Sequence, residues 1–324
     1  MKLQQLRFLA AIAKHNLNIS TAAEHLYTSQ PGVSKQIKLL EEELGVQLFS
    51  RHGKHLTQIT PAGRRIIEHA ESILREVENI RTIAAEFCDD QKGTLSIATT
   101  HTQARYVLPP VVTEFRKRYP NVVLHLHQGT PKQIAQLAVA GEVDFAIATE
   151  AIGAVKDLVM IPCYRWNRSI VVPTGHPLCD APALTLELVA QYPIVTYVFG
   201  FTGRSQLDAA FGSAGLKPNL VFTATDADII KTYVRLGLGI GIIARMAYLP
   251  EEDSDLVALD AGHLVEANTT KIGFRRGLYL RNYMYDFMAL FAPHLRTQLL
   301  EQAANSTSQD EVDVLCKDIE LPEL

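Results

Sequence analysis

Apolar residues in the first sixty positions recur at helical spacing and predict three short helices. The apolar face of the first helix consists of Leu3, Leu6, Ala10 and Ala13. We expect this helix to stop around residues 16–18, and a second one, capped by Ser20 or Thr21, to end at Leu26. A third helix is expected to begin at Gln30-Pro31, because a proline in the first turn removes no hydrogen bond from a helix.

The third predicted helix has one apolar and one polar face. Its apolar face consists of Val33, Ile37, Leu40 and Leu44. Its polar face consists of Gln30, Ser34, Lys35 and Lys38. Two short helices, a tight turn at residues 27–29 and a third helix with donors on its free face form a helix-turn-helix, whose last helix enters the major groove of DNA.

A basic segment follows this helix. Residues 50–55, Ser-Arg-His-Gly-Lys-His, lie between apolar stretches at 48–49 and 56–59 and predict a hairpin that touches phosphate. The sequence therefore predicts a winged helix-turn-helix over residues 1–60. Its predicted DNA contacts are Gln30, Pro31, Ser34, Lys35 and Lys38 on the third helix, and Arg51 and Lys54 on phosphate. The alternative is a generic three-helix bundle with a polar face.

Residues 61–88 predict one long helix, with Thr60 as its cap and Pro61 in its first turn. Apolar residues alternate four and three apart along it, which is the a and d spacing of a coiled coil. This seam consists of Ile66, Ala70, Ile73, Val77, Ile80, Ala84 and Phe87. A seam only two positions wide favours dimerisation, and helix-turn-helix proteins commonly dimerise to read two half-sites. The alternative is a helix that packs on its own domain.

After a polar joint at residues 89–93 the pattern changes to strands that alternate with helices, which predicts an α/β domain over 89–324. The predicted strands are 94–99, 122–127, 143–148, 169–172, 194–197, 220–225, 239–243 and 271–274. The predicted helices are 108–118, 131–140, 184–190, 204–214 and 227–236. We expect two lobes of the periplasmic-binding-protein type, followed by an acidic tail at 305–324. Lobe I is expected at about 93–162 and 268–300, and lobe II at about 163–267.

Hydroxyl and amide side chains follow several of these strands at their carboxyl ends. The predicted effector-binding residues are Thr100, Thr102 and Gln103 after strand 94–99, Thr149 after 143–148 and Thr202 after 194–197. In open α/β sheets ligands bind beyond the carboxyl ends of strands, and helix N-termini favour anions. Each threonine alone is better explained as a helix cap, but together they predict a largely neutral site for a small polar anion. Arg204, as a first-turn residue, is expected to point to solvent.

The charge of the chain is divided unevenly. The net charge is −4, yet residues 1–65 hold nine Lys and Arg against four Glu, and residues 305–324 hold six acids against one lysine. A basic module on an acidic body predicts a polyanionic partner for the module. No apolar run reaches the ~18 residues of a membrane helix, and residues 1–7 lack the apolar core of a secretory signal, so we expect a cytoplasmic protein.

Few residues suggest catalysis or metal binding. The four cysteines have neither CxxC nor metal-ligand spacing, so we expect unreactive thiols in a reducing compartment. GxSxG, HExxH and GxxxxGK[ST] do not occur, and the glycines at 237–241 lack GxGxxG spacing. His101 beside Thr100 is expected to be a solvated loop histidine. The sequence therefore predicts no enzyme, no metal and no cofactor.

Several motifs together resemble the LysR-type transcriptional regulators. The matching segments are residues 21–26, 29–37, 39–41, 48–51, 56–57 and 60–63. Gly32 and Val33 depart from the pattern, because alanine and leucine are common there, and Gly32 slightly weakens the helix. The resemblance implies a DNA-binding regulator whose linker helix pairs subunits and whose body binds an effector.

Parts of the body resemble the branch of this family that activates cysteine biosynthesis. The matching segments are residues 99–106, 145–150, 199–205, 223–228 and 272–276, with the opening residues 1–7 and the acidic tail. This resemblance implies an inducer such as N-acetylserine or O-acetylserine, with sulfate or thiosulfate as competing occupants. It also implies tetramers built from dimers and action with RNA polymerase, and it matches all five predicted effector-binding residues to pocket positions.

Two alternatives stay open. A branch of the family linked to sulfonate use shares residues 99–106, although the segment around Phe199 and Phe201 fits the cysteine branch better. A periplasmic solute-binding protein has the same body architecture. The absence of a signal peptide and the basic N-terminal module argue against that second alternative.

Overall fold

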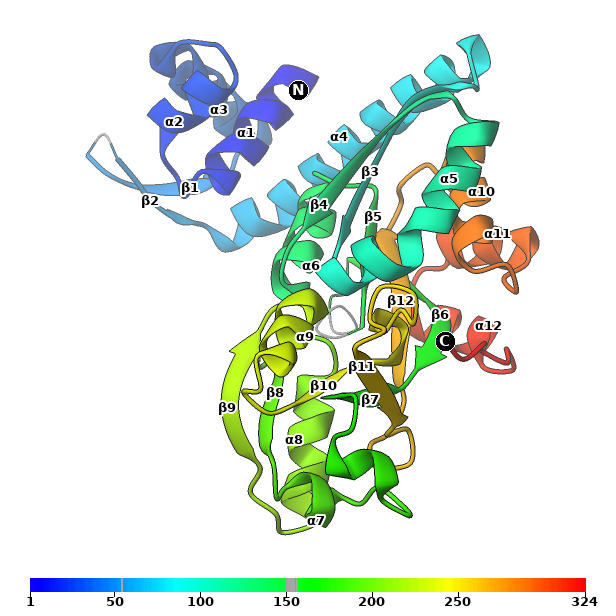
Figure 1. The fold of residues 1–324 in the computed structure, drawn as a ribbon. Coiled ribbons are helices and arrows are strands. Elements are labelled where there is room, and N and C mark those ends of the chain that lie inside the picture. The colour runs from blue at the N-terminus through cyan, green and yellow to red at the C-terminus, as the bar shows by residue number, and fades with distance from the viewer. Residues whose placement is uncertain (54, 150–154, 156) are drawn as a thin grey trace. The chain divides into compact units, whose positions relative to one another are not determined.

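The computed structural model describes residues 1–53, 55–149, 155 and 157–324. Lys54, one of the predicted phosphate contacts, lies outside these residues. The chain divides into two compact units, residues 1–88 and 89–324 (Figure 1). The division falls at the polar joint where the sequence pattern changes from helices to alternating strands and helices.

The first unit contains three short helices, a hairpin and one long helix. They are α1 (Leu3–Lys14), α2 (Ile19–His25), α3 (Gln30–Leu44), β1 (Phe49–His52), β2 (His55–Ile59) and α4 (Pro61–Cys88). The hairpin strands pair antiparallel, with Phe49 opposite Ile59 and His52 opposite His55. The predicted winged helix-turn-helix and the long helix are confirmed.

Two details of this unit differ from the sequence prediction. Helix α2 begins at Ile19, because the side chain of Asn18, not either predicted cap, accepts a hydrogen bond from the Thr21 amide at 3.1 Å. Leu44, predicted to face the core, is 37% exposed. The helix ends at that residue, where Gly45 takes the left-handed conformation with φ +67° and the chain leaves the core.

The first turns of α4 are fixed to the first unit. Ile67 and Ala70 are buried in the same core as α1 and α3. The Gly63 amide donates a hydrogen bond of 2.9 Å to the cap residue Thr60. A Cβ at Gly63 would lie 2.1 Å from the Leu48 carbonyl oxygen, so this close approach of α4 to the hairpin requires glycine.

The second unit contains two five-stranded mixed sheets, one in each lobe (Figure 1). Lobe I has the order β4-β3-β5-β12-β6, formed by β3 (Lys92–Thr99), β4 (Asn121–Gln128), β5 (Phe145–Ala148), β6 (Leu158–Trp166) and β12 (Asn268–Arg275). Lobe II has the order β11-β7-β10-β8-β9, formed by β7 (Arg168–Pro173), β8 (Pro193–Tyr197), β9 (Asn219–Ala224), β10 (Ile240–Ala244) and β11 (Leu256–Asp260). In lobe I, strands β3, β4 and β5 run parallel, and β12 and β6 run antiparallel to their neighbours. In lobe II, strands β8, β9 and β10 run parallel, and β7 and β11 run antiparallel to their neighbours.

Helices pack on these sheets as the α/β prediction requires. They are α5 (Leu108–Arg118), α6 (Pro131–Ala140), α7 (Leu186–Val189), α8 (Arg204–Ser213), α9 (Ala227–Arg235), α10 (Asn282–Phe291), α11 (Thr297–Asn305) and α12 (Gln309–Cys316). The shorter turns are the π-helical η1 (Gln103–Val107) and the 3₁₀ turns η2 (Pro177–Asp180) and η3 (Arg245–Ala247). The eight predicted strands and five predicted helices occur near their predicted bounds. Strands β6 and β11 and helices α10, α11 and α12 were not predicted.

The first lobe crossing lies later than predicted. β6 continues to Trp166 in lobe I and β7 begins at Arg168 in lobe II, so the chain crosses at Asn167 and not after residue 162. A proline at 162 suggests the end of a strand, but β6 is the edge of its sheet, where a missing N–H is tolerated. The return crossing ends at Asn268, which pairs with Trp166, so the two crossings lie side by side.

The acidic tail folds onto lobe I. Gln309 of α12 accepts a hydrogen bond from the Met160 amide and donates one to the Met160 carbonyl, both at 2.9 Å. Further along, the Arg165 amide donates to the Pro322 carbonyl at 2.8 Å, and the Leu324 amide donates to the Arg165 carbonyl at 2.9 Å. The tail therefore covers the edge strand β6, whose free backbone groups would otherwise be open to pairing.

Candidate functional site

The first unit presents the polar face of α3 to solvent. Gln30, Pro31, Lys35 and Lys38 are exposed, and Ser34 is half-buried. The Gln30 side-chain amide donates to the Ser34 hydroxyl at 3.1 Å, which orders both groups on the same face. The structure thus brings the predicted groove residues together, and their individual contacts with DNA stay predictions.

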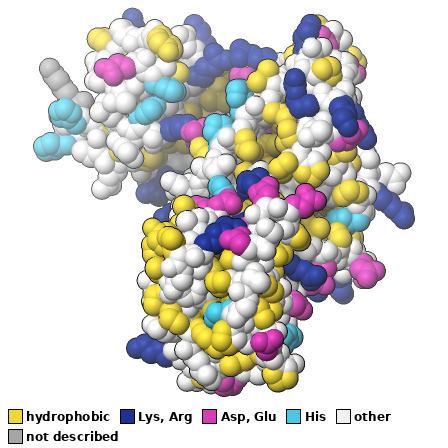
Figure 2. Space-filling model, in the orientation of Figure 1, with side chains coloured by type: hydrophobic (Ala, Val, Ile, Leu, Met, Phe, Trp, Pro, Cys, Tyr) yellow, Lys and Arg dark blue, Asp and Glu magenta, His cyan; other side chains and the backbone are white. Residues whose placement is uncertain are grey.

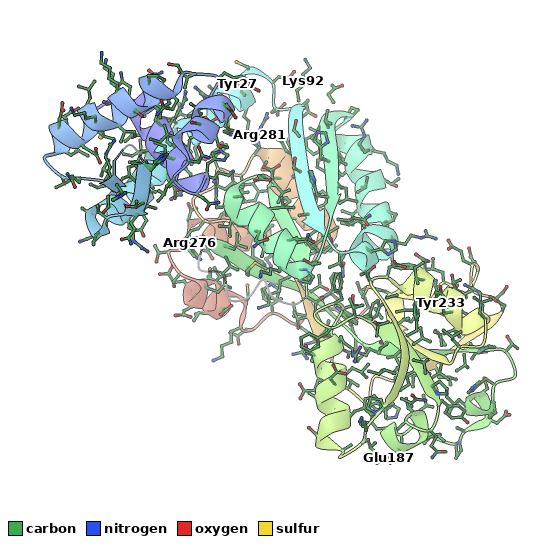
Figure 3. All side chains as sticks on the ribbon, turned by 90° about the vertical axis from the view of Figure 1, so that its left-hand side faces the viewer. Tyr27, Lys92, Glu187, Tyr233, Arg276 and Arg281 are labelled. Carbon is green, nitrogen blue, oxygen red and sulfur yellow. The ribbon has the colours of Figure 1, made fainter. Side chains whose placement is uncertain are left out.

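The turn before α3 carries an aromatic ring that sequence reasoning did not single out. Tyr27 is 98% exposed and its backbone φ is +50° (Figure 3). Bulky residues rarely adopt the left-handed region. The sequence signal for this turn is the Tyr-Thr-Ser segment between two predicted helices. The turn therefore presents Tyr27 to solvent at the N-terminal end of the predicted groove helix.

Arg51 of the hairpin is anchored to α3. Its guanidinium pairs with Glu41 at 2.9 Å. The other carboxylate oxygen of Glu41 accepts hydrogen bonds from the amides of Leu48 and Phe49 at 2.9 and 3.2 Å. Glu41 therefore ties the hairpin to the helix and orients Arg51, whose predicted phosphate contact would have to share the guanidinium with this carboxylate.

The predicted seam of α4 has two parts. Ala70 is buried in the core of its own unit, and Ile66 packs against that core, so these two belong to the alternative of a helix packed on its own domain. Beyond them the seam is open: Ile80 is 65% and Phe87 is 89% exposed. An apolar stripe that its own chain leaves uncovered in the C-terminal half of α4 is the surface that a second chain would bury.

All five predicted effector-binding residues line one cavity. Its lining consists of Thr100, Thr102, Gln103, Pro131, Thr149, Trp166 and Thr202. Thr202 comes from lobe II and the other six from lobe I, so the cavity lies between the lobes. Sequence reasoning missed Pro131 and Trp166, although the presence of a single tryptophan in the chain was a usable signal.

A buried hydrogen-bond network supports the lobe I wall of this cavity. The indole N–H of Trp166 donates to the hydroxyl of Thr270 at 3.1 Å, and that hydroxyl lies 3.3 Å from the hydroxyl of Thr149. The Gln103 side chain donates to Thr270 at 3.3 Å and accepts from the hydroxyl of Tyr164. Burial raises the pKa of Tyr164, so its hydroxyl stays a donor at physiological pH.

Thr202 forms the lobe II wall in a strained conformation. Its φ is +44°, unusual for a β-branched residue, and its side chain is buried. Arg204, predicted to point to solvent, is instead buried: its guanidinium donates to the Tyr197 carbonyl at 2.7 Å and pairs with Asp208 at 2.8 Å. The prediction failed because the carbonyl at the end of β8 and Asp208, one turn further along α8, both lie within hydrogen-bond distance of the guanidinium.

Thr102 is a buried cavity hydroxyl with unused hydrogen-bonding capacity. Its Oγ1 is buried and makes no hydrogen bond of normal length and angle to any residue that the structure describes. It lies beside the hydroxyl of Tyr197, whose pKa is raised to about 12 by burial. An unsatisfied buried hydroxyl costs free energy, which a ligand or water would recover by accepting or donating there.

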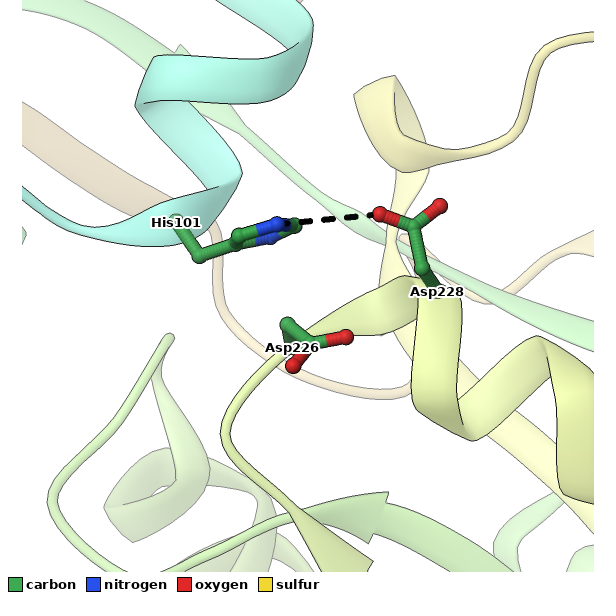
Figure 4. A group of neighbouring side chains, drawn as sticks. All are labelled: His101, Asp226 and Asp228. Atoms are coloured by element: carbon green, nitrogen blue, oxygen red, sulfur yellow. Dashed lines mark ion pairs between the residues drawn. The ribbon is translucent and has the colours of Figure 1, made fainter. Parts of the chain in front are cut away.

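Acidic and basic side chains gather over the boundary between the lobes (Figure 2). Among them His101, Asp226 and Asp228 lie together, with the His101 imidazole 3.8 Å from the Asp228 carboxylate (Figure 4). Asp228 accepts a hydrogen bond from the Tyr106 hydroxyl at 2.7 Å, and Asp226 accepts one from the Ile229 amide at 2.9 Å. Both carboxylates thus already accept hydrogen bonds from the protein, which favours a contact between the lobes over a metal site.

The described residues include no helix that is both long and apolar enough to cross a bilayer.

Two family models match the chain. One, described as a bacterial regulatory helix-turn-helix protein of the lysR family, matches residues 3–64, and the other, described as a LysR substrate binding domain, matches residues 89–296. These ranges correspond to the module with the exposed α3 face and to the two-lobed unit with the cavity.

Known proteins similar to the chain agree with these matches. The chain is 54% identical to the HTH-type transcriptional regulator CysB of Haemophilus influenzae over 99% of both chains. It is 52% identical to the HTH-type transcriptional regulator SsuR of Burkholderia cenocepacia, over 91% of this chain and 96% of that protein. The crystal structure of the cofactor-binding domain of the Cbl transcriptional regulator matches with a TM-score of 0.64 and 46% identity, over 66% of this chain and 95% of that one. The chain therefore belongs to the LysR family of helix-turn-helix transcriptional regulators.

Proposed function

We propose that this regulator controls sulfur assimilation and cysteine biosynthesis genes, and that its inducer is a small anion of the acetylserine type. The observation that carries the proposal is the convergence of five hydroxyl and amide residues on one cavity between the lobes. The 54% identity with CysB along almost the whole chain supports the proposal that these are the regulated genes. The inducer is N-acetylserine or O-acetylserine, and sulfate or thiosulfate occupies the same cavity in competition.

The chemistry of the cavity supports a ligand with one negative charge. Among the residues that the structure describes, its lining offers hydroxyls, one side-chain amide and one indole, and no lysine or arginine. A polyphosphate would require several cations, whereas one carboxylate or one sulfate is satisfied by neutral donors. An acetyl group adds a small apolar part and a carbonyl acceptor, which suits the mixed lining of Pro131, Trp166 and the threonines.

The first unit binds promoter DNA in this proposal. The exposed groove face of α3 contacts base edges and backbone through Gln30, Pro31, Ser34, Lys35 and Lys38, while Arg51 and Lys54 contact phosphate. The dimer forms along the open part of the α4 seam, and dimers assemble into a tetramer. The regulator acts in the cytoplasm on RNA polymerase at its promoters.

A second candidate is regulation of sulfonate use. The likeness to the Cbl domain favours it, because that domain is 46% identical and residues 99–106 also resemble the sulfonate-linked branch. A solute-binding protein does not account for the helix-turn-helix family match at residues 3–64.

Calorimetry on the full-length protein tests the inducer. We expect N-acetylserine or O-acetylserine to bind, sulfate and thiosulfate to compete, and an alkyl sulfonate to bind more weakly. Thr100→Val and Thr202→Val remove one hydroxyl each and should weaken inducer binding about ten-fold or more. Both variants should keep the DNA affinity of the wild type without inducer.

Genome-wide footprinting with and without acetylserine tests the regulated genes. Binding upstream of cysteine biosynthesis genes that changes with acetylserine is the expected result. Unchanged acetylserine affinity in both threonine variants would remove the cavity from the mechanism, and footprints restricted to sulfonate genes would favour the second candidate.

A further inference from the structure

The π-helical turn η1 and the residues just before it have two functional faces. One face contributes Thr100, Thr102 and Gln103 to the cavity. The other contributes His101, Arg105 and Tyr106 to a contact with lobe II. A π-helical turn is rare and costs hydrogen-bond geometry, and such turns recur at functional sites. A single short segment thus lines the cavity and touches the opposite lobe.

The contact with lobe II includes two close pairs. The Tyr106 hydroxyl donates to the Asp228 carboxylate at 2.7 Å, and the Arg105 guanidinium pairs with Glu252 at 2.6 Å. Arg105 also lies 4.0 Å from Asp228. Both acids belong to lobe II: Asp228 lies in the first turn of α9, and Glu252 lies between η3 and β11.

A buried charge extends the contact into lobe II. Lys231 is buried on α9 and lies 5.3 Å from the centre of the Tyr106 ring, which is a cation–π distance. Its ammonium is 3.7 Å from Asp228 and 2.8 Å from the buried Asp253. Tyr106 therefore inserts between two charges of lobe II, with its hydroxyl on the acid and its ring on the lysine.

We propose that Tyr106 and Asp228, assisted by Arg105 and Glu252, are positioning residues for effector binding. They hold η1 on lobe II, and through η1 they place Thr100, Thr102 and Gln103 opposite Thr202. The inference rests on the proposed effector site in the cavity. None of the four residues lines that cavity, so they act on the ligand only through the placement of the residues that do.

Linkage gives the direction of the effect. A ligand that touches both walls binds the conformation in which the lobes are in contact more tightly than any other conformation. Contacts that stabilise the same conformation raise the fraction of molecules competent to bind, and the apparent dissociation constant rises when that fraction falls. Loss of the Tyr106–Asp228 contact should therefore weaken effector binding, although no contact between the protein and the effector is removed.

The Tyr106–Asp228 pair should contribute more free energy to the contact between the lobes than the Arg105–Glu252 pair. Arg105 and Glu252 are exposed, and solvent-exposed ion pairs contribute little. Tyr106 and Asp228 are half-buried beside the buried Lys231, where a hydrogen bond to a charged acceptor contributes more. The variants Tyr106→Phe and Asp228→Asn are therefore the informative ones, and both preserve the shape of the side chain.

The experiment is a double-mutant cycle on the full-length protein, with N-acetylserine, O-acetylserine and sulfate as probes in calorimetry. We expect Tyr106→Phe and Asp228→Asn each to raise the apparent dissociation constant about three- to ten-fold. The double variant should bind the effector no more weakly than the weaker-binding single variant, because both substitutions remove the same Tyr106–Asp228 contact. Glu114→Gln removes a half-buried acid that pairs with Lys117 and Arg118 on α5, away from this contact, and it should leave the affinity unchanged.

Two readouts separate positioning from damage to the fold. The thermal midpoints of the variants, and their DNA affinity without effector, should match those of the wild type. Wild-type affinity in both single variants, with weakened binding in Thr202→Val, would overturn this inference and leave the proposed function intact. Additive losses in the double variant would also overturn it. Wild-type affinity in Thr202→Val and in Thr100→Val, or no binding of any probe to the wild type, would overturn the proposed function and this inference with it.

Discussion

The guanidinium of Arg168 donates a hydrogen bond of 2.6 Å to the carbonyl of Gly203. Arg168 is buried at the first lobe crossing, and Gly203 follows Thr202, the lobe II residue of the cavity. With the Asn268 amide turned so that its oxygen faces the guanidinium, Asn268 accepts from both terminal nitrogens at 3.0 and 3.1 Å. One buried charge therefore joins both crossing segments to the turn that carries the strained Thr202.

This arrangement makes Gly203 intolerant of any side chain. Its φ is +71°, and a Cβ would lie 2.2 Å from the Arg168 guanidinium and 2.5 Å from the Asn268 side chain. Gly203→Ala should displace the Thr202 turn and lower the thermal midpoint of unfolding. In calorimetry it should weaken effector binding at least ten-fold. Gly212→Ala on the same helix, where nothing lies within 4 Å, is the matched control and should change neither. Normal effector affinity in Gly203→Ala would show that the turn is not fixed by Arg168.

The sequence alone predicted much of this cavity because the relevant positions are local. Thr100 and Thr149 directly follow β3 and β5, and Thr202 lies in the turn between β8 and α8, so all three lie beyond the carboxyl ends of strands, where ligands bind in open α/β sheets. Arg168, Trp166 and Thr270 could not be predicted in the same way. Their roles depend on two crossings that are adjacent in space although Trp166 and Asn268 are 102 residues apart in sequence, and no periodicity encodes that pairing.

Lys35 supplies the clearest test of the DNA-binding surface. It is exposed on the predicted groove face of α3. Lys35→Ala should weaken operator binding by about 1–3 kcal/mol if the lysine contacts a base edge, and it should relax the preference at one position. Fluorescence anisotropy on operator variants, at several salt concentrations, measures both effects. Lys117→Ala, which removes an exposed lysine of the second unit, should change neither affinity nor salt slope.

Ile80 tests the dimerisation seam better than residues nearer the start of α4. At 65% exposed it contributes little to the core of its own unit, whereas Ala70 is buried there. Ile80→Asp should leave the chain folded and dissociate the dimer, because two carboxylates would be buried against each other at a cost of several kcal/mol. Sedimentation velocity gives the oligomeric state, and Arg81→Ala is the control beside the seam. A dimer that survives in Ile80→Asp would assign association to another surface.

The electrostatic core of lobe II was beyond sequence reasoning for a similar reason. Lys231 and Asp253 are 22 residues apart and read as ordinary surface residues of a helix and a loop. In the structure both are buried, and their 2.8 Å ion pair is completed by Arg235 and by the Leu249 amide. The sequence does not indicate whether a charged side chain will be buried, or which oppositely charged side chain will then pair with it.

Asp253 makes a further prediction about the pH dependence of stability. Burial opposes ionisation, but the hydrogen bonds from Lys231, the Leu249 amide and Arg235 outweigh it, so the pKa of Asp253 is lowered from its usual value. A carboxyl whose pKa is lower in the folded state stabilises the fold above its unfolded pKa of about 3.9, and this contribution is lost as pH falls through the folded pKa.

Asp253→Asn leaves the charge of Lys231 buried without its nearest acid and should cost about 3 kcal/mol at pH 7. In urea unfolding, the difference from the wild type should persist at pH 5 and shrink only below about pH 4. Asp255→Asn, at the exposed partner of Arg235, should have a smaller effect at pH 7. An equal difference between wild type and Asp253→Asn at pH 7 and at pH 3 would contradict the assignment of the effect to this carboxylate.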